Sequence, residues 1–158
     1  MGCDRCGVPA RLGWHIVSGD AVGEWVAARV DGHYSKEIAT AIGLERDGNI
    51  IAGVIYENWN RRSIVCHIAV EGRLTPGFIA AIFDYPFNVC AVEKVISPVG
   101  SGNTKSQRLA TSMGYVEEAR IKDAHPDGDL ILYTLKRSDC RFLGENYGKK
   151  RTKPTTST

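Results

Sequence analysis

Two side chains able to transfer protons stand in neighbouring apolar runs of the chain. His67 lies within the run 63–71, and Glu57 lies near the end of the run before it. An imidazole gains and loses its proton near neutral pH, so His67 is the best candidate for a general base. Glu57 could act as a base directly or through a water molecule. The alternative interpretations are a histidine packed beneath a helix and a solvated carboxylate beside Asn58.

The direction of His67 follows from the alternation of side chains along an extended strand. His67 shares one face with Val65 and Ala69, whereas Cys66 and Ile68 belong to the opposite face.

Residue types that bind metals occur in two places, but neither has the spacing of a metal site. Cys3 and Cys6 form one Cys-x-x-Cys pair, which His15 or Cys140 would complete only by chance of folding. A structural zinc site normally needs four ligands. The second place is a group of residues around Pro126, whose types are explained by turn chemistry: Asp123, His125, Asp127 and Asp129. We expect no metal at either place.

The spacing of apolar residues predicts the elements that must position these side chains. Asp47-Gly48 marks a hairpin, Thr75-Pro76 begins a helix and Gly114 ends one. Asp20 is the expected N-cap of the first helix. We expect strands over residues 13–18, 40–46, 50–59, 63–71, 94–99, 115–122 and 129–136, and helices over residues 21–30, 75–85 and 104–113.

These elements follow one another in the order β-α-β-β-β-α-β-α-β-β. Strands that alternate with helices and also form hairpins predict a mixed sheet in an α/β (α+β) fold, rather than a doubly wound one. The second, third and fourth strands are expected to form an antiparallel meander. We expect one domain at residues 13–143, an N-terminal extension at 1–12 and a flexible basic tail at 144–158.

The composition favours a cytoplasmic globular protein. The chain has 158 residues, of which 43% are hydrophobic and 24% are charged, and its net charge is +2. No apolar run approaches the roughly 20 residues that span a bilayer. Five scattered cysteines are typical of a reducing compartment rather than of a disulfide framework. The basic cluster from Lys149 to Lys153 carries too little charge for us to expect nucleic acid as a partner.

Residues 103–118, NTKSQRLATSMGYVEE, resemble the fourth-helix signature of the GNAT superfamily of N-acetyltransferases. The shared features are an Asn, a small residue three positions later, a Leu, and a Gly-aromatic pair before an acidic strand. The ribosomal-protein N-terminal acetyltransferase branch is the most similar. Residues 83–88 and 140–143 also resemble small GNAT-like proteins of tailed bacteriophages. The resemblance extends over residues 14–143.

This resemblance implies a GNAT-like acyltransferase that moves an acetyl group from acetyl-CoA to an amine acceptor by direct attack. The strands 63–71 and 94–99 would splay apart and admit the pantetheine arm, whose amides pair with the strand edge. A strand N–H would stabilise the oxyanion, and His67 or Glu57 would take the ammonium proton. The implied cofactor-binding residues are Ile68, Ala69 and Val70 for pantetheine, Arg73, Thr75 and Gly77 for the pyrophosphate, and Asn103 and Ser106 near the sulfur.

The chain departs from the family pattern at two places. Residues 72–78 replace the usual Arg/Gln-x-x-Gly-x-Gly/Ala loop, and Pro76 within them has no N–H to donate. Ala110 stands seven residues after Asn103, where many members carry the tyrosine that protonates the leaving thiolate. That proton would then come from Ser106, Asn103 or a water molecule.

Two other functions remain open beside acetyl transfer. One is a GNAT-like binding module without catalysis, such as a phage accessory protein that contacts a host protein. The other is a GNAT-like enzyme that modifies nucleobases with another donor. In the acetyltransferase interpretation, Tyr34 is a candidate for lining the site of an unidentified amine acceptor. The sequence also leaves open whether the chain forms a homodimer.

Overall fold

The computed structural model describes residues 12–30, 32–144 and 147 of the chain. Cys3, Cys6 and the basic cluster from Lys149 to Lys153 lie outside these residues. Within the described residues, no helix is both long and apolar enough to cross a membrane. The main elements, in the predicted order, are β1 (Trp14–Ser18), α1 (Asp20–Ala27), β2 (Thr40–Arg46), β3 (Asn49–Glu57), β4 (Ser63–Val70), α2 (Pro76–Asp84), β5 (Lys94–Gly100), α3 (Thr104–Ser112), β6 (Val116–His125) and β7 (Gly128–Lys136).

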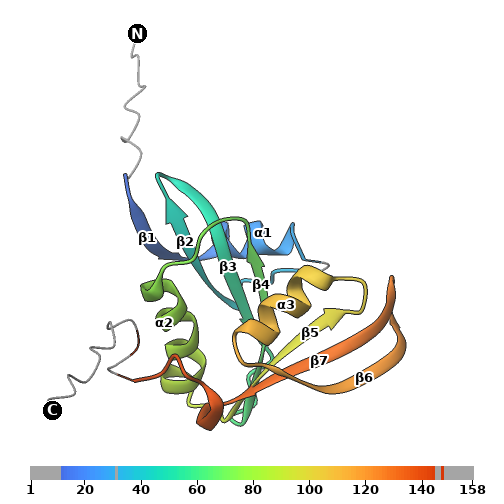
Figure 1. Ribbon diagram of the computed structural model, residues 1–158. Helices are drawn as coiled ribbons and strands as arrows, with labels where there is room; N and C mark the ends of the chain where they lie inside the picture. The colour runs from blue at the N-terminus through green and yellow to red at the C-terminus, as the bar shows by residue number, and fades with distance from the viewer. Residues whose placement is uncertain (1–11, 31, 145–146, 148–158) are drawn as a thin grey trace, which may run out of the picture.

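The strands form one seven-stranded sheet in the order β1-β2-β3-β4-β5-β7-β6. Neighbouring strands are antiparallel except β4 and β5, which run parallel. β2, β3 and β4 form the predicted meander. α1 lies on one face of the sheet, and α2 and α3 lie on the other (Figure 1). The prediction of a mixed sheet in an α/β fold is therefore confirmed.

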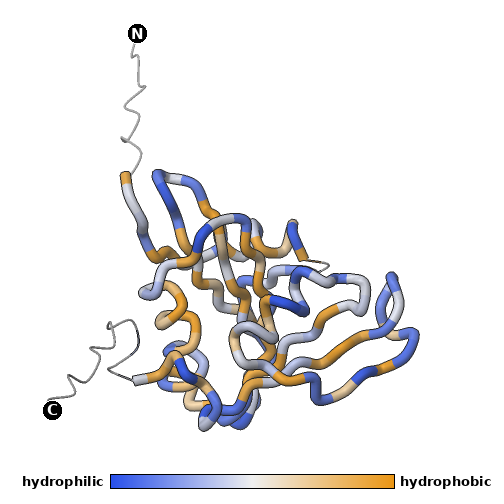
Figure 2. The backbone as a smooth tube through the Cα atoms, viewed as in Figure 1, coloured by the Kyte–Doolittle hydropathy of each residue, from blue (hydrophilic) through white to orange (hydrophobic). Residues whose placement is uncertain are grey.

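The hydrophobic core is divided between the two faces of the sheet, because side chains alternate along each strand. Phe78 of α2 and Cys66 of β4 belong to the larger cluster. Val26 of α1 and Ala69 of β4 belong to the smaller one, on the opposite face. Figure 2 shows the hydrophobic residues of α2 and the hydrophilic tips of the hairpins. His67, which alternates with Cys66, therefore faces the α1 side, as predicted.

Two helix boundaries differ from the predicted ones. Asp20 is not the N-cap of α1 but its first residue, because the preceding Gly19 adopts a φ of 110° and turns the chain into the helix. α2 begins directly after Thr75, as predicted, but the chain continues beyond its end through a π-helical segment, Tyr85–Val89. Pro86 fits this segment because the first residues of a helical turn need no partner for an N–H.

The hairpin of β6 and β7 is tighter than predicted. β6 extends to His125 and β7 begins at Gly128, so only Pro126 and Asp127 form the turn. The register shifts between Ile121 and His125, which is the effect of a β-bulge. The longer strand carries His125 to the far end of the sheet, beside the end of β5.

Candidate active site

β4 and β5 diverge after a short paired segment. Their register joins Ser63 to Lys94, Ile64 to Val95 and Val65 to Ile96, and no further pair follows among the described residues. β4 stays paired with β3 as far as Val70, and β5 stays paired with β7 as far as Gly100. The sheet therefore opens as a wedge between the second halves of β4 and β5 (Figure 1). The predicted splaying of this strand pair is confirmed.

A cavity of about 540 Å³ fills the wedge. β4 contributes His67 and Ile68 to its wall, and α3 contributes Asn103, Ser106 and Ala110. The second half of β5, the residues after α1 and the β6–β7 hairpin complete the wall. Because α1 and α3 lie on opposite faces, the cavity passes through the sheet.

A second cavity, of about 480 Å³, continues from the wedge toward the end of β4. Residues 68–71 form one side of it, and Lys105 and Leu109 of α3 form the other. Both cavities include Ile68, Asn103 and Ser106 in their walls, so together they make one groove, which we call the wedge groove. The predicted cofactor-binding residues that line it are Ile68, Ala69, Val70, Asn103 and Ser106.

The backbone of β4 offers hydrogen-bonding groups to the wedge groove. The Glu71 amide donates to the Ile51 carbonyl of β3 over 2.7 Å. Since the direction of hydrogen bonding alternates along a strand, Ile68 and Val70 turn their amide and carbonyl groups the other way, toward β5. The Val70 carbonyl accepts from Lys105 Nζ of α3 over 2.8 Å, in agreement with this direction. An extended amide chain can pair with such an edge as an added strand does.

The structure brings the two candidate bases together. His67 Nε2 and Glu57 Oε1 lie 2.8 Å apart, and both side chains are half-buried. The β3–β4 register pairs Glu57 with Val65 and Ile55 with His67, so the pair lies on a diagonal of one sheet face. Beside an ionised carboxylate, a neutral imidazole would carry its proton on Nε2 and keep the lone pair on Nδ1. His67 also lines the wedge groove.

The N-terminal turn of α3 holds Asn103 and Ser106 at the groove. Asn103 Oδ1 accepts from the Ser106 amide over 3.1 Å, so Asn103 is the N-cap of the helix. One turn further on, Ala110 lines the wedge where many GNAT members carry a tyrosine. No tyrosine stands among the described residues that line the larger cavity. The predicted supply of the leaving-group proton by Ser106, Asn103 or water stays a prediction.

The structure does not bring the predicted pyrophosphate residues to the groove. Arg73, Thr75 and Gly77 lie beyond the end of β4, at the start of α2, and line neither of its two cavities. Thr75 Oγ1 accepts from the Phe78 amide over 3.2 Å, as a helix cap does. Their predicted role in binding the pyrophosphate stays a prediction.

Tyr34 lies away from the wedge groove. Its hydroxyl donates to Asp20 Oδ1 over 2.8 Å, and it lines a separate cavity with Glu24 and Glu37. Burial and this hydrogen bond raise the pKa of Tyr34 to about 12. The Tyr34 side chain therefore holds the loop after α1 against the start of that helix, and the acceptor role proposed for it does not follow from its position.

Arg29, His125 and Asp127 are among the groove residues that the sequence analysis did not assign to the site. The ring of His125 lies directly over Gly100, where an added Cβ would stand 2.6 Å from the ring. The Asp127 amide donates to His125 Nδ1 over 3.2 Å. Turn chemistry does describe this segment, but only the bulged β6–β7 hairpin brings it to the wedge.

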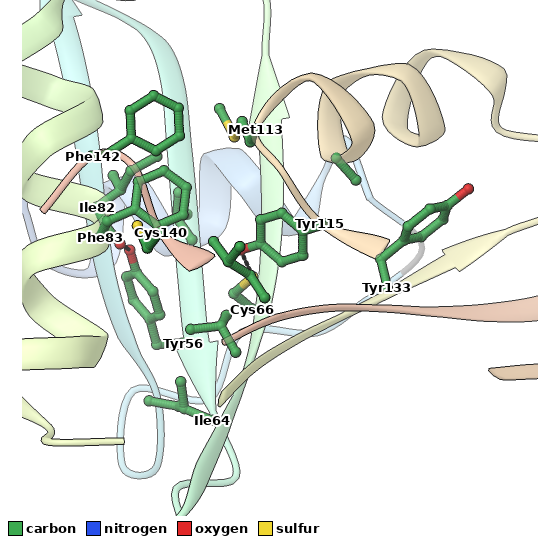
Figure 3. Packing of buried hydrophobic residues seen from close by; sticks show 14 of the residues in the cluster. Tyr56, Ile64, Cys66, Ile82, Phe83, Met113, Tyr115, Tyr133, Cys140 and Phe142 are labelled. Atoms are coloured by element: carbon green, nitrogen blue, oxygen red, sulfur yellow. Dashed lines mark hydrogen bonds between the residues drawn. The ribbon is translucent and has the colours of Figure 1, made fainter. Parts of the chain in front are cut away.

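The Cys66 thiol of β4 points into the core. Its Sγ lies 3.6 Å from the Tyr115 hydroxyl (Figure 3). Burial raises the pKa of Cys66 to about 11, so the thiol stays protonated near neutral pH. A protonated, buried thiol is a poor nucleophile.

Similarity to other proteins is found at the level of structure. No protein-family model and no curated protein matches the chain. Mutant forms of the spermidine/spermine N-acetyltransferase SpeG from Vibrio cholerae align over 79% of this chain and 95% of theirs, with 16% identity and a TM-score of 0.63. A chimera of that SpeG with hSSAT aligns over 83% and 99%, with 15% identity and a TM-score of 0.65.

A third solved structure is the ribosomal-protein-S5-alanine acetyltransferase from Vibrio fischeri. It aligns over 66% of this chain and 65% of its own, with 18% identity and a TM-score of 0.55. Identities this low establish the fold alone. The mixed sheet and its three helices match those of the GNAT acetyltransferases.

Proposed function

From the GNAT fold and the groove through its sheet, we propose that the chain transfers an acetyl group from acetyl-CoA to an amine by direct attack. The observation that carries the proposal is the divergence of β4 and β5, because it opens a passage between the two faces of the sheet. The donor can then enter on the α3 side and the acceptor on the α1 side. The thioester and the amine meet in the gap.

The wedge groove fits an acyl-CoA in shape and in hydrogen-bonding groups. Ile68, Ala69 and Val70 supply the strand edge for the pantetheine amides, and Asn103 and Ser106 stand opposite them. Acetyl-CoA supplies an activated acyl group on a thiol that leaves readily. The residues of the protein have to orient this group, stabilise the oxyanion and move two protons.

The proton transfers follow from the positions of the side chains. His67 Nδ1 takes the proton from the acceptor ammonium, and Glu57 stabilises the imidazolium that forms. The free amine attacks the carbonyl carbon, and a β4 amide such as that of Ile68 stabilises the oxyanion. When the carbon–sulfur bond breaks, the proton that the attacking nitrogen still has to lose passes through Ser106 or a water molecule to the thiolate. The amide, the free thiol and the proton on His67, which goes on to solvent, balance the reaction.

Direct attack is favoured over a covalent enzyme intermediate by the state of Cys66. Its thiol faces the core rather than the gap, and burial raises its pKa to about 11. The same arrangement makes an acyl-cysteine route unfavourable.

The first test separates binding from turnover. We expect isothermal titration to detect acetyl-CoA binding, and thiol release to follow when an amine is added. The structural neighbours suggest spermidine and a peptide with an N-terminal alanine as the first acceptors to try. His67→Gln should lower kcat by about 100-fold or more and leave acetyl-CoA binding unchanged, because it removes the base only.

His15→Gln is the matched control, because His15 lies on the edge strand β1, far along the sheet from the wedge. Equal turnover in the His67 and His15 variants would remove His67 from the reaction. If the wild-type protein fails to bind acetyl-CoA, the acetyltransferase proposal itself is wrong.

A binding module without catalysis is the second candidate. It is favoured by the start of α2, where Pro76 has no N–H and the Thr75 hydroxyl already caps the helix. A module of this kind would show no CoA-dependent change in thermal unfolding and no thiol release with any amine. Acetyl-CoA that raises the melting temperature would argue against it.

A further inference from the structure

A lysine bridges the mouth of the wedge groove. Lys105 is the second residue of α3, and its Nζ donates to the Val70 carbonyl at the end of β4, over 2.8 Å. The carbonyl belongs to the strand edge that faces the gap, and the lysine reaches it from the other wall. The side chain therefore closes the part of the groove that is furthest from His67.

This bridge is held weakly. Lys105 is exposed, and its partner is a neutral carbonyl rather than a carboxylate. Within the described part of the chain, Lys105 forms no ion pair. An ammonium prefers an anion to a neutral acceptor, because opposite charges add a Coulomb attraction to the hydrogen bond. An anion that enters the groove should therefore displace the Val70 carbonyl.

The neighbouring cation is already neutralised. Arg29 lines both cavities of the groove, but its Nε lies 2.6 Å from Glu71 Oε1 and its guanidinium stacks on Trp25. The charge of Arg29 is thus balanced and its position is fixed on the α1 side. Among the described residues that line the groove, Lys105 is the remaining Lys or Arg, and it lies at the end of β4.

The start of α2 offers few groups to an anion. Pro76 has no N–H, and the Phe78 amide already donates to Thr75 Oγ1. The backbone loop that normally binds the pyrophosphate is therefore reduced, at the same end of β4 where Lys105 is found. A side chain from the opposite wall can supply the missing donor.

We propose that Lys105 binds the diphosphate of the CoA thioester and, in doing so, releases the Val70 carbonyl to a pantetheine amide. This inference rests on the proposed function and assigns one more residue to the same groove. In the absence of the thioester, Lys105 donates a hydrogen bond to the Val70 carbonyl at the strand edge. When the thioester enters, the lysine binds the diphosphate instead, and the Val70 carbonyl becomes free to accept from a pantetheine amide. Both effects favour binding of the thioester.

Titration of wild-type and variant proteins with three ligands tests the proposal. The ligands are acetyl-CoA, acetyl-dephospho-CoA, which lacks only the 3′-phosphate, and ADP, which carries adenosine and the diphosphate but neither the pantetheine arm nor the 3′-phosphate. Lys105→Met should raise the Kd of all three by about tenfold, as the loss of one charge-assisted hydrogen bond predicts. Lys105→Arg should restore most of the affinity, and the salt dependence of Kd should weaken in the Met variant.

Lys122→Met on β6 is the control, since Lys122 is equally exposed and lies at the sheet edge away from the groove. All variants should keep the melting temperature of the wild type, and Lys105→Gln replaces the Met variant if that one unfolds. An unchanged Kd for acetyl-CoA in Lys105→Met would overturn this inference and leave the proposed function standing. A loss seen with acetyl-CoA but not with acetyl-dephospho-CoA would assign Lys105 to the 3′-phosphate and also overturn it. If the wild type binds no acetyl-CoA, both proposals fall.

Discussion

At the scale of single residues, the Glu57–His67 pair carries the proposed chemistry. A lone histidine on a sheet face could serve either as a packing residue or as a base. The 2.8 Å contact with a carboxylate orients the ring of His67. In the proposed mechanism Glu57 acts through His67 as a positioning residue, and its role as a direct base stays a prediction.

Glu57→Gln tests this division of roles. The amide keeps the size of the side chain and one acceptor oxygen but loses the charge that stabilises the imidazolium. We expect kcat to fall by about tenfold to 100-fold with little change in KM, because only the step that charges His67 is affected. Steady-state kinetics with Glu45→Gln on β2 as the control measures the effect. A rise in KM with unchanged kcat would instead place Glu57 in acceptor binding.

At the scale of elements, the position of α1 depends on a close approach to the strands beneath it. α1 covers the face that carries His67, and Val26 of α1 lies against Gly53 of β3. An added Cβ at Gly53 would stand 2.6 Å from Val26 Cγ2, which is closer than packed atoms tolerate. Because Gly53 has no side chain, α1 can pack close to the sheet. Arg29, which follows the last turn of α1, then forms part of the groove wall.

Gly53→Ala should destabilise the fold by about 1–3 kcal/mol, because the helix or the strand must move to admit the methyl group. Urea unfolding measures the change. Gly77→Ala is the matched control, since Gly77 lies in the first turn of α2 and an added Cβ there meets nothing within 4 Å. Equal stability of the Gly53 variant and the wild type would show that α1 can move away from the sheet without a loss in the free energy of unfolding.

At the scale of the whole molecule, the larger core is both apolar and rich in buried hydroxyl and thiol groups. Figure 3 shows Tyr56, Cys66 and Tyr115 together in this core. Burial raises the pKa of Cys66 from 9.0 to about 11 and raises the pKa of both tyrosines well above 10.0. All three groups are neutral when folded, and they hydrogen-bond to one another or, for Tyr56, to the Ile82 carbonyl.

These shifts predict that the fold loses stability in alkali. Between pH 9 and about 11 the unfolded chain releases the Cys66 proton while the folded chain retains it, so the unfolded state is favoured as pH rises. The melting temperature should fall steadily over this interval. The fall should be shallower in Cys66→Ala, measured relative to its own value at pH 8, than in the wild type. Cys90→Ala should keep the full decline, and an identical slope in the Cys66 variant would contradict the assignment.

The sequence by itself determined the features that depend on near neighbours in the chain. The structure confirms the order of strands and helices, the meander around Asp47-Gly48 and the start of α2 at Thr75-Pro76. These features could be predicted because turn and cap residues act on backbone groups only a few positions away in the chain. The alternation that turned His67 toward α1 is local in the same sense. The splaying of β4 and β5 was implied by resemblance to a family rather than by any local pattern.

Only the tertiary structure decided which distant residues meet. Whether Glu57 touches His67 depends on the register of two strands, and whether His125 reaches the wedge depends on the bulge that precedes it in β6. Lys105 meets Val70 only because α3 lies across the gap that β4 and β5 leave open. Contacts of this kind are set by packing and register over the whole sheet, and no spacing along the chain encodes them.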